Sequence, residues 1–150
     1  MKRLATVVVA LVVFLLSSRA EARPGVRLGI VDDPDEFFAG FFYEIPLGAA
    51  GPGVFVLDPG VDLGIGDEFF SIRGQLNAKY FIPVGEFFLY PLMGLSVMYV
   101  NADCGDNRDC DDTEAGLNIG LGFAFLERFN LELYATVDHP DLTFSFGFVF

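Results

Sequence analysis

The sequence predicts an all-β fold, an antiparallel up-and-down barrel of eight strands. Two observations support this prediction: apolar residues alternate through many segments, and turn residues separate those segments at regular intervals. The clearest segment is the ending LTFSFGFVF, in which apolar residues fill every second position from Leu142 to Phe150. Such alternation places one set of side chains on each face of a strand.

The N-terminal residues are typical of a cleaved signal peptide. Two basic residues follow the initiator Met, then a largely apolar run over 4–16 and the small-residue pattern of Ala20 and Ala22. A membrane-spanning helix needs about 20 apolar residues, so this run is too short. We therefore expect residues 1–22 to be a signal peptide, cut after Ala22, and residues 23–150 to form one barrel domain.

The composition of the expected mature chain limits its function. It keeps six basic and twenty acidic residues, a net charge of −14, which argues against a nucleic-acid partner. The whole chain is 53% hydrophobic and has 18 Phe, which argues against disorder. The sequence thus predicts an exported, acidic and strongly apolar folded domain.

Turn residues divide the mature chain into eight segments. The intervening stretches are DDPDE, GAAGP, GDE, PVGE, NADCGDNRDCDDT, LER and DHPD, and all except LER contain Asp, Asn, Gly or Pro, which favour turns. A barrel strand that crosses a membrane takes about 9–11 residues, which leaves short connections here. The expected strands are 25–31, 37–47, 53–65, 69–81, 87–100, 114–125, 129–137 and 142–150.

Two connections predict strand register from side-chain sorting. A turn over residues 67–68 puts Asp62 opposite Arg73, an opposite-charge pair on the polar face. The LER connection keeps Phe125 and Phe129 on one face only as a three-residue loop.

Two further connections predict register in the same way. A hairpin over residues 139–140 pairs Val137 with Leu142, and the PVGE turn pairs Ile82 with Phe87. Pro91 falls inside a strand, where we expect a bulge.

The composition of the polar faces indicates which side is enclosed. These faces carry small and neutral polar residues with few charges, whereas a water-exposed face carries many Lys and Glu. The sequence therefore predicts an eight-stranded antiparallel transmembrane β-barrel with apolar residues outside. Segment 37–47 is apolar on both faces, and only Glu44 indicates its inner side. The expected polar network of the lumen is Glu44, Asp62, Arg73, Lys79, Glu132 and Tyr134.

Aromatic residues gather near both sets of strand ends, as expected for the two interfaces of a membrane. Phe37, Phe69, Phe70 and Tyr99 form one expected girdle. The other expected girdle is Phe81, Phe87, Phe88, Phe125, Phe129 and Phe150.

This pattern resembles the small eight-stranded outer-membrane β-barrels of Gram-negative bacteria, the OmpA/OmpX-like group. The resemblance implies an outer-membrane location, contact with membrane lipid and lipopolysaccharide, and a monomer. It also implies that the barrel-assembly machinery recognises the last strand through its terminal aromatic residues, here Phe144, Phe146, Phe148 and Phe150. The lumen of so small a barrel is just wide enough for side chains, which favours a plug over a permeation path.

With the N-terminus on the periplasmic side, the expected outer connections are DDPDE, GDE, NADCGDNRDCDDT and DHPD. All four are acidic, and the longest one contains both cysteines. In an exported chain Cys104 and Cys110 are expected to form a disulfide, since zinc would need further ligands. A weak calcium candidate in the same loop consists of Asp103, Asp106, Asp111 and Asp112, although their spacing is not that of an EF-hand.

The sequence offers no catalytic constellation and no cofactor motif. His139 is the sole histidine, and Ser145 lies six residues away on the polar face of the last strand. We therefore expect a non-enzymatic protein with a structural or surface-interaction role. A narrow channel or passage for small solutes or apolar molecules is the first alternative, and a soluble periplasmic lipocalin-like binding barrel is the second.

Overall fold

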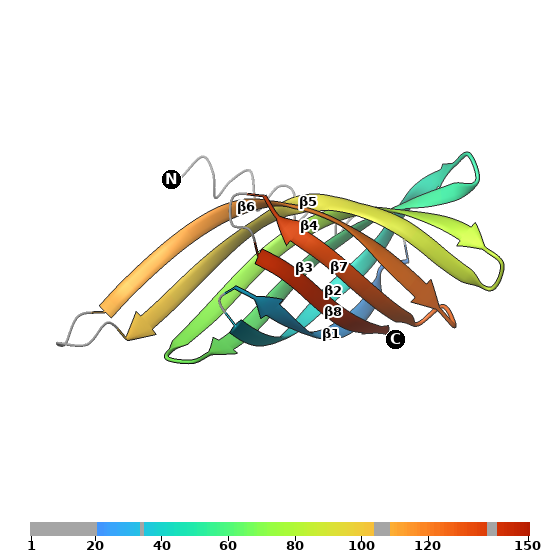
Figure 1. Cartoon of the computed structure of the whole chain (residues 1–150). Coiled ribbons are helices and arrows are strands. Elements are labelled where there is room, and N and C mark those ends of the chain that lie inside the picture. The colour runs from blue at the N-terminus through green and yellow to red at the C-terminus, as the bar shows by residue number, and fades with distance from the viewer. Residues whose placement is uncertain (1–20, 34, 104–108, 138–140) are drawn as a thin grey trace.

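The chain folds as a closed β-barrel in a computed structural model that describes residues 21–33, 35–103, 109–137 and 141–150. Eight strands follow one another in chain order around the barrel (Figure 1). They are β1 (Arg23–Asp32), β2 (Asp35–Ala50), β3 (Gly53–Gly66), β4 (Phe69–Val84), β5 (Phe87–Asp103), β6 (Asp109–Phe125), β7 (Phe129–Thr136) and β8 (Asp141–Val149).

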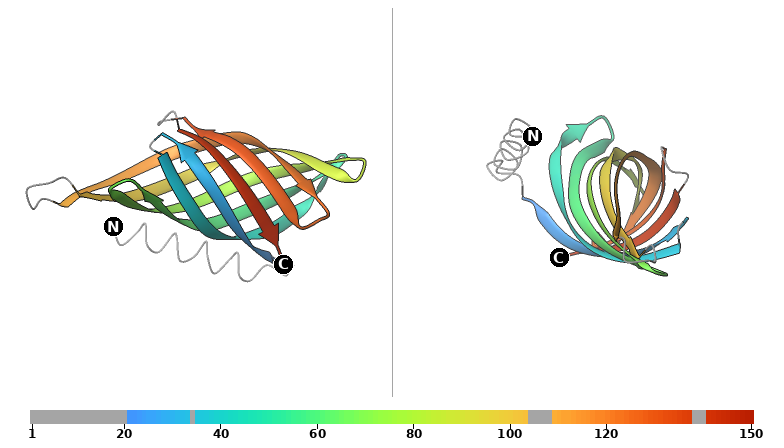
Figure 2. Two further views of the ribbon diagram at one scale, coloured as in Figure 1. Left: turned by 60° about the horizontal axis from the view of Figure 1, so that its bottom comes forward. Right: turned by 90° about the vertical axis from the view of Figure 1, so that its left-hand side faces the viewer.

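Every strand is antiparallel to both neighbours, and β1 pairs with β8 to close the ring (Figure 2). The last residue takes part in this closure, because the Phe150 N–H donates to the Pro24 carbonyl over 2.9 Å. The prediction of an all-β, eight-stranded antiparallel barrel is confirmed. Within the described residues, no helix is long and apolar enough to cross a membrane.

The barrel has two distinct ends. The end with the β2–β3, β4–β5 and β6–β7 connections is called the turn end here, and β1 starts there. The opposite end, with the β1–β2, β3–β4, β5–β6 and β7–β8 connections, is called the loop end. At the loop end β5 and β6 run past the other strands, since residues 109–116 of β6 pair with β5 alone (Figure 1).

The strands sort their side chains with apolar residues outside and polar residues inside. Phe144 and Phe146 on β8 are 46% and 39% exposed, whereas Arg73 and Gln75 on β4 are only 7% and 5% exposed. The predicted orientation of the two faces is therefore confirmed. It is the reverse of a soluble barrel, which encloses its apolar face.

The register is as predicted at two connections. Gly66 faces Phe69 across a two-residue turn, which puts Asp62 opposite Arg73. Phe125 faces Phe129 across a three-residue loop. In both cases a one-residue slip would have exchanged the two faces, so the alternation fixed the pairing.

The register of the β4–β5 hairpin differs from the prediction by two residues. Val84, not Ile82, faces Phe87 across a tight turn at Gly85 and Glu86. Gly85 has φ 66°, a conformation that favours glycine.

The β7–β8 hairpin also differs by two residues, because Leu142 faces Ala135 instead of Val137. A slip of two residues leaves each side chain on its own face. Alternation therefore cannot detect such a slip.

The expected bulge at Pro91 is wrong. Pro91 faces Leu121 in an unbroken β5–β6 ladder, and the β4–β5 register is the same at Lys79–Leu92 as at Ile82–Leu89. The proline, which has no N–H, only interrupts the pairing opposite Tyr80. The bulge of the barrel lies in β2, between Pro46 and Gly48.

Aromatic rings form a continuous outer band at the turn end. Phe125 and Phe129 stack with centroids 5.2 Å apart, Phe129 contacts Phe148 at 5.2 Å, and Phe148 contacts Phe150 at 5.4 Å.

Two residues of the expected girdle at this end lie inside the barrel instead. Phe81 stacks on the buried ring of Tyr90 at 4.3 Å, and Phe88 packs against Phe81 at 6.2 Å. The physical reason is strand parity, because Phe81 shares its face of β4 with Lys79.

Candidate functional site: the polar lumen

The lumen is built from alternate residues of all eight strands. The six residues that the sequence predicts for it are all buried in the structure: Glu44, Asp62, Arg73, Lys79, Glu132 and Tyr134. They come from β2, β3, β4 and β7, so the barrel brings together side chains that are far apart in sequence.

Lys79 lies at the centre of the lumen between two carboxylates. Its Nζ is 2.6 Å from Glu132 Oε1 and also pairs with Asp58. The Tyr90 hydroxyl donates to Glu132 Oε1 over 2.9 Å, and the Lys79 ammonium lies 5.4 Å from the Tyr90 ring centroid. All four side chains are buried, so each charge depends on these partners.

Arg27 crosses the lumen from β1 to β3. Its Nε donates to Asp62 Oδ1 over 2.7 Å, and its Nη1 is 3.7 Å from Asp58 Oδ1. Gln75 also donates to Asp62. The expected pairing of Asp62 with its ladder neighbour Arg73 is wrong at the side-chain level, because Asp62 pairs with Arg27, which reaches it from β1 past the intervening β2.

Arg73 forms a second cluster toward the loop end. Its Nη2 is 3.5 Å from Glu36 Oε1 on β2, and Ser71 donates to Glu36 Oε2 over 2.7 Å. The guanidinium lies 5.8 Å from the centroid of the buried Phe38 ring. The ion-pair partner of Arg73 is thus Glu36 and not its ladder neighbour Asp62.

Neutral polar side chains join the charged clusters to the β5–β7 side of the wall. Asn77 donates to Gln75 over 2.9 Å, and Asn118 donates to Asn77 over 3.2 Å. Ser96 and Thr136 each donate to Asn118 Oδ1 over 3.1 Å. Buried polar groups are stable when they are hydrogen-bonded in this way.

Glycines make room for the longest charged side chains. A Cβ on Gly40 would lie 1.8 Å from Asp62 Oδ1, and one on Gly60 would lie 2.1 Å from Arg27 Nη2. The Arg27–Asp62 pair therefore requires bare backbone on both sides.

Side chains fill the middle of the barrel and leave a pocket at each end. Between Arg27, Lys79 and Glu132 the space open to a water molecule is about 0 Å³. Beside Arg73 and Ser96 it is about 10 Å³. A pocket of about 340 Å³ opens at the turn end. The described side chains thus form a plug in the middle of the lumen.

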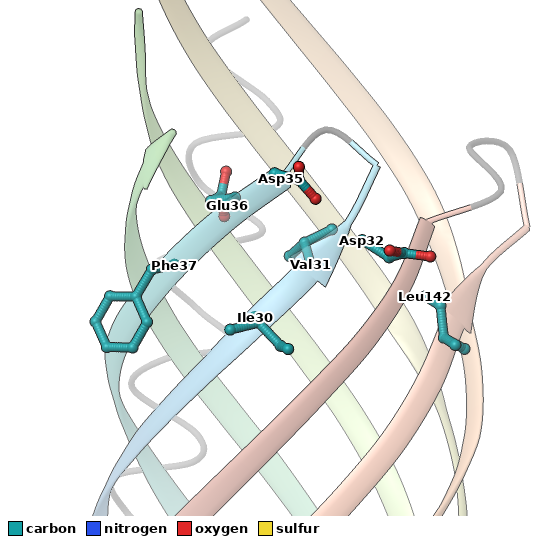
Figure 3. Close-up of a pocket in the computed structure, with 7 residues that line it drawn as sticks. All are labelled: Ile30, Val31, Asp32, Asp35, Glu36, Phe37 and Leu142. Carbon is teal, nitrogen blue, oxygen red and sulfur yellow. The ribbon is translucent and has the colours of Figure 1, made fainter. Parts of the chain in front are cut away.

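A larger pocket of about 540 Å³ lies at the loop end (Figure 3). Asp32, Asp35 and Glu36 contribute carboxylates near the β1–β2 connection. Ile30 and Phe37, in contrast, belong to the exposed apolar face.

Several lumen residues were not predicted from the sequence. Arg27 lies on the first expected strand, for which no lumen residue was named, and Glu36 belonged to the expected turn DDPDE. Asp58 faces Asn77 in the predicted β3–β4 ladder, so the register already contained the signal for it.

The predictions for the long β5–β6 loop stay predictions. Cys104 and Asp106 lie outside the described residues, as does His139 in the last connection. Asp112 is exposed, and its Oδ1 accepts a hydrogen bond from the Thr113 N–H over 2.8 Å. Among the described side chains, no group of three or more His, Cys, Asp or Glu could hold a metal ion.

The chain has the fold of the small eight-stranded outer-membrane β-barrels, and comparison with solved structures shows this. The N-terminal β-barrel domain of Pseudomonas aeruginosa OprF is 15% identical, with a TM-score of 0.57 over 85% of this chain and 97% of that one. Ail of Yersinia pestis is 10% identical, with a TM-score of 0.54 over 87% of this chain and 95% of that one.

The same fold also carries an enzyme. The outer membrane enzyme PagL is 11% identical, with a TM-score of 0.52 over 85% of this chain and 97% of that one. No protein-family model matches the chain, and no curated protein matches it. At these identities the likeness shows the fold and leaves the activity open.

Proposed function

We propose that the protein is an integral outer-membrane barrel of a Gram-negative bacterium, exported by its signal peptide, with a structural or surface-interaction role. The observation that carries this proposal is the reversed sorting of the two faces. Large apolar side chains all around the wall are exposed, among them Leu95 at 64% and Leu121 at 59%, while Lys79 is 1% exposed. An apolar surface of this extent is stable against lipid and unstable in water.

The filled lumen supports a scaffold role over transport. Ion pairs and hydrogen bonds occupy the centre, so the barrel holds its connections at the loop end on a rigid base. Single-channel recording in planar bilayers tests this role against the narrow-channel alternative. The plug predicts no discrete openings, and regular openings with the wild-type protein would favour a channel.

A non-enzymatic role belongs to the same proposal. Ser145 is 1% exposed and donates to Glu132 over 3.5 Å, so its hydroxyl is engaged inside the plug. Incubation of the purified protein with outer-membrane lipid, followed by mass spectrometry, should return the lipid unchanged. A protein-dependent lipid product would contradict this part of the proposal.

The proposed partners are membrane lipid and lipopolysaccharide around the wall, and the barrel-assembly machinery during insertion. The exposed aromatic residues of β8 suit both roles, and a barrel with no open strand edge at its seam suits a monomer. We expect no nucleic-acid partner and no cofactor.

Membrane fractionation together with gel mobility tests the proposal most simply. The protein should enter the outer-membrane fraction, resist carbonate extraction, and migrate faster before boiling than after. Release by carbonate without detergent would instead support the soluble lipocalin-like alternative.

A further inference from the structure

Glu44 differs from the other carboxylates at the core of the lumen. Glu36 pairs with Arg73, Asp58 and Glu132 pair with Lys79, and Asp62 pairs with Arg27. Glu44 is just as buried, at 6% exposed, but has no ion pair in the described part of the chain. Its one hydrogen bond comes from Asn130 Nδ2 to Oε1 over 2.8 Å. A buried carboxylate without a cation is costly to keep charged.

Glu44 also lines the pocket of about 340 Å³ at the turn end. Phe81, Phe88, Val54 and Val56 supply apolar walls, and Asn130 lies beside the carboxylate. This volume and this mixture of apolar walls with few polar groups are those of small-molecule sites.

Neither basic side chain near the pocket makes an ion pair with Glu44 in the described part of the chain. Arg23 lines the same pocket, but its Nη2 donates to the Glu127 backbone carbonyl. Lys79 has Asp58 and Glu132 as its ion-pair partners. The pocket therefore offers a carboxylate that has no ion-pair partner among the described residues.

We infer that this pocket binds a primary ammonium group carried on a small apolar body, with Glu44 as the counter-ion. The ammonium donates to Glu44. The apolar body packs with the Phe81 and Phe88 rings on one side and the valines of β3 on the other. The inference goes beyond the proposed scaffold role, since it assigns a ligand site to the turn end of the barrel.

Two sources could supply the ammonium. One is a free amphipathic amine that enters from the turn end. The other is the chain itself, because cleavage after Ala22 would give Arg23 an α-ammonium, and Arg23 stands opposite Glu44 in the β1–β2 ladder.

Calorimetric titration of the processed protein in lipid nanodiscs tests the inference. The probe is 2-phenylethylamine, its neutral counterpart is 2-phenylethanol, and empty nanodiscs correct for partition into lipid. In the form that leaves Glu44 free, either the processed protein or its α-acetylated form, the amine should bind about tenfold or more tightly than the alcohol, and Glu44→Gln should remove that preference. Glu86→Gln, an exposed residue at the same end, is the matched control and should leave it intact.

A third variant reduces the volume of the pocket and leaves the Glu44 carboxylate unchanged. Val56→Phe should fill the space and abolish binding of both probes. Heat-modifiable gel mobility of each variant shows that the barrel is folded.

Acetylation of the α-amine separates the two sources, since Lys79, the one lysine of the expected mature chain, is 1% exposed. If the α-ammonium occupies Glu44, acetylation should raise the amine's affinity about tenfold. If a free amine is the ligand, acetylation should leave its affinity unchanged. Both results depend on Glu44 and support the inference. Equal affinity for amine and alcohol in both forms, or an amine affinity that Glu44→Gln does not lower, would overturn it.

Discussion

Lys79→Met should be the most damaging single substitution in the lumen. Met keeps the length of the side chain and its apolar stem but removes the ammonium. Asp58 is 0% exposed and Glu132 is 4% exposed, so both carboxylates would lose their principal cation inside the barrel. Arg27 remains 3.7 Å from Asp58 and compensates only in part.

The expected loss in the free energy of unfolding follows from the two carboxylates that lose their cation. Removal of one partner from a buried ion pair costs about 3–5 kcal/mol, mostly because a buried charge loses its compensation. Lys79 serves two such carboxylates, and relaxation of the lumen offsets part of the second loss. We therefore expect the free energy of unfolding to fall by about 3–5 kcal/mol.

Urea titration in lipid vesicles, followed by heat-modifiable gel mobility, measures this change. Arg128→Met, an exposed residue in the β6–β7 connection, is the control and should change stability by less than about 0.5 kcal/mol. The triple variant Lys79→Met, Asp58→Asn, Glu132→Gln should recover much of the loss, because no unpaired charge remains. If Lys79→Met stays within about 1 kcal/mol of wild type, the ion-pair plug does not stabilise the barrel as argued.

Three further predictions test other contacts. Gly40→Ala should lower the free energy of unfolding by about 1–3 kcal/mol in the same titration. The reason is that the added Cβ would lie 1.8 Å from Asp62 Oδ1, and an unchanged urea midpoint would refute this close approach. Tyr90→Phe should lower the free energy of unfolding by about 1–3 kcal/mol, because the hydrogen bond to Glu132 is lost. Tyr80→Phe, near the turn-end rim, should lower it less, and equal losses would count against the buried hydrogen bond. The disulfide predicted between Cys104 and Cys110 should leave no thiol to alkylate until the protein is reduced, and mass spectrometry of the unreduced, denatured chain that finds two alkylated cysteines would exclude it.

The fold was largely predictable because a barrel that crosses a membrane imposes a strict period of two on every strand. Side-chain sorting fixed the β3–β4 register, where the charges of Asp62 and Arg73 had to share a face. It could not fix the β7–β8 register, because pairing Leu142 with Ala135 or with Val137 sorts the faces equally well. The energies that choose between those two registers lie in turn geometry.

The lumen was predictable as a set of residues but not as a set of pairs. Parity placed Glu44, Lys79 and Glu132 inside, because parity is a property of each strand alone. Partner choice depends on which strands the curved wall brings close together, and here Arg27 on β1 reaches Asp62 on β3 past the intervening β2. The bare backbone of Gly40 and Gly60 permits that reach, and no neighbour rule along the sequence contains it.

The central claim, that lipid tails surround the apolar wall, can be tested with one fluorescence measurement. The protein has no Trp, so Leu95→Trp would place a single indole at an outward position of β5 whose native side chain is 64% exposed. In vesicles of lipids brominated on the acyl chains, its emission should be strongly quenched, while iodide in the water should have little effect. Strong quenching by iodide with none by the brominated lipids would contradict the account.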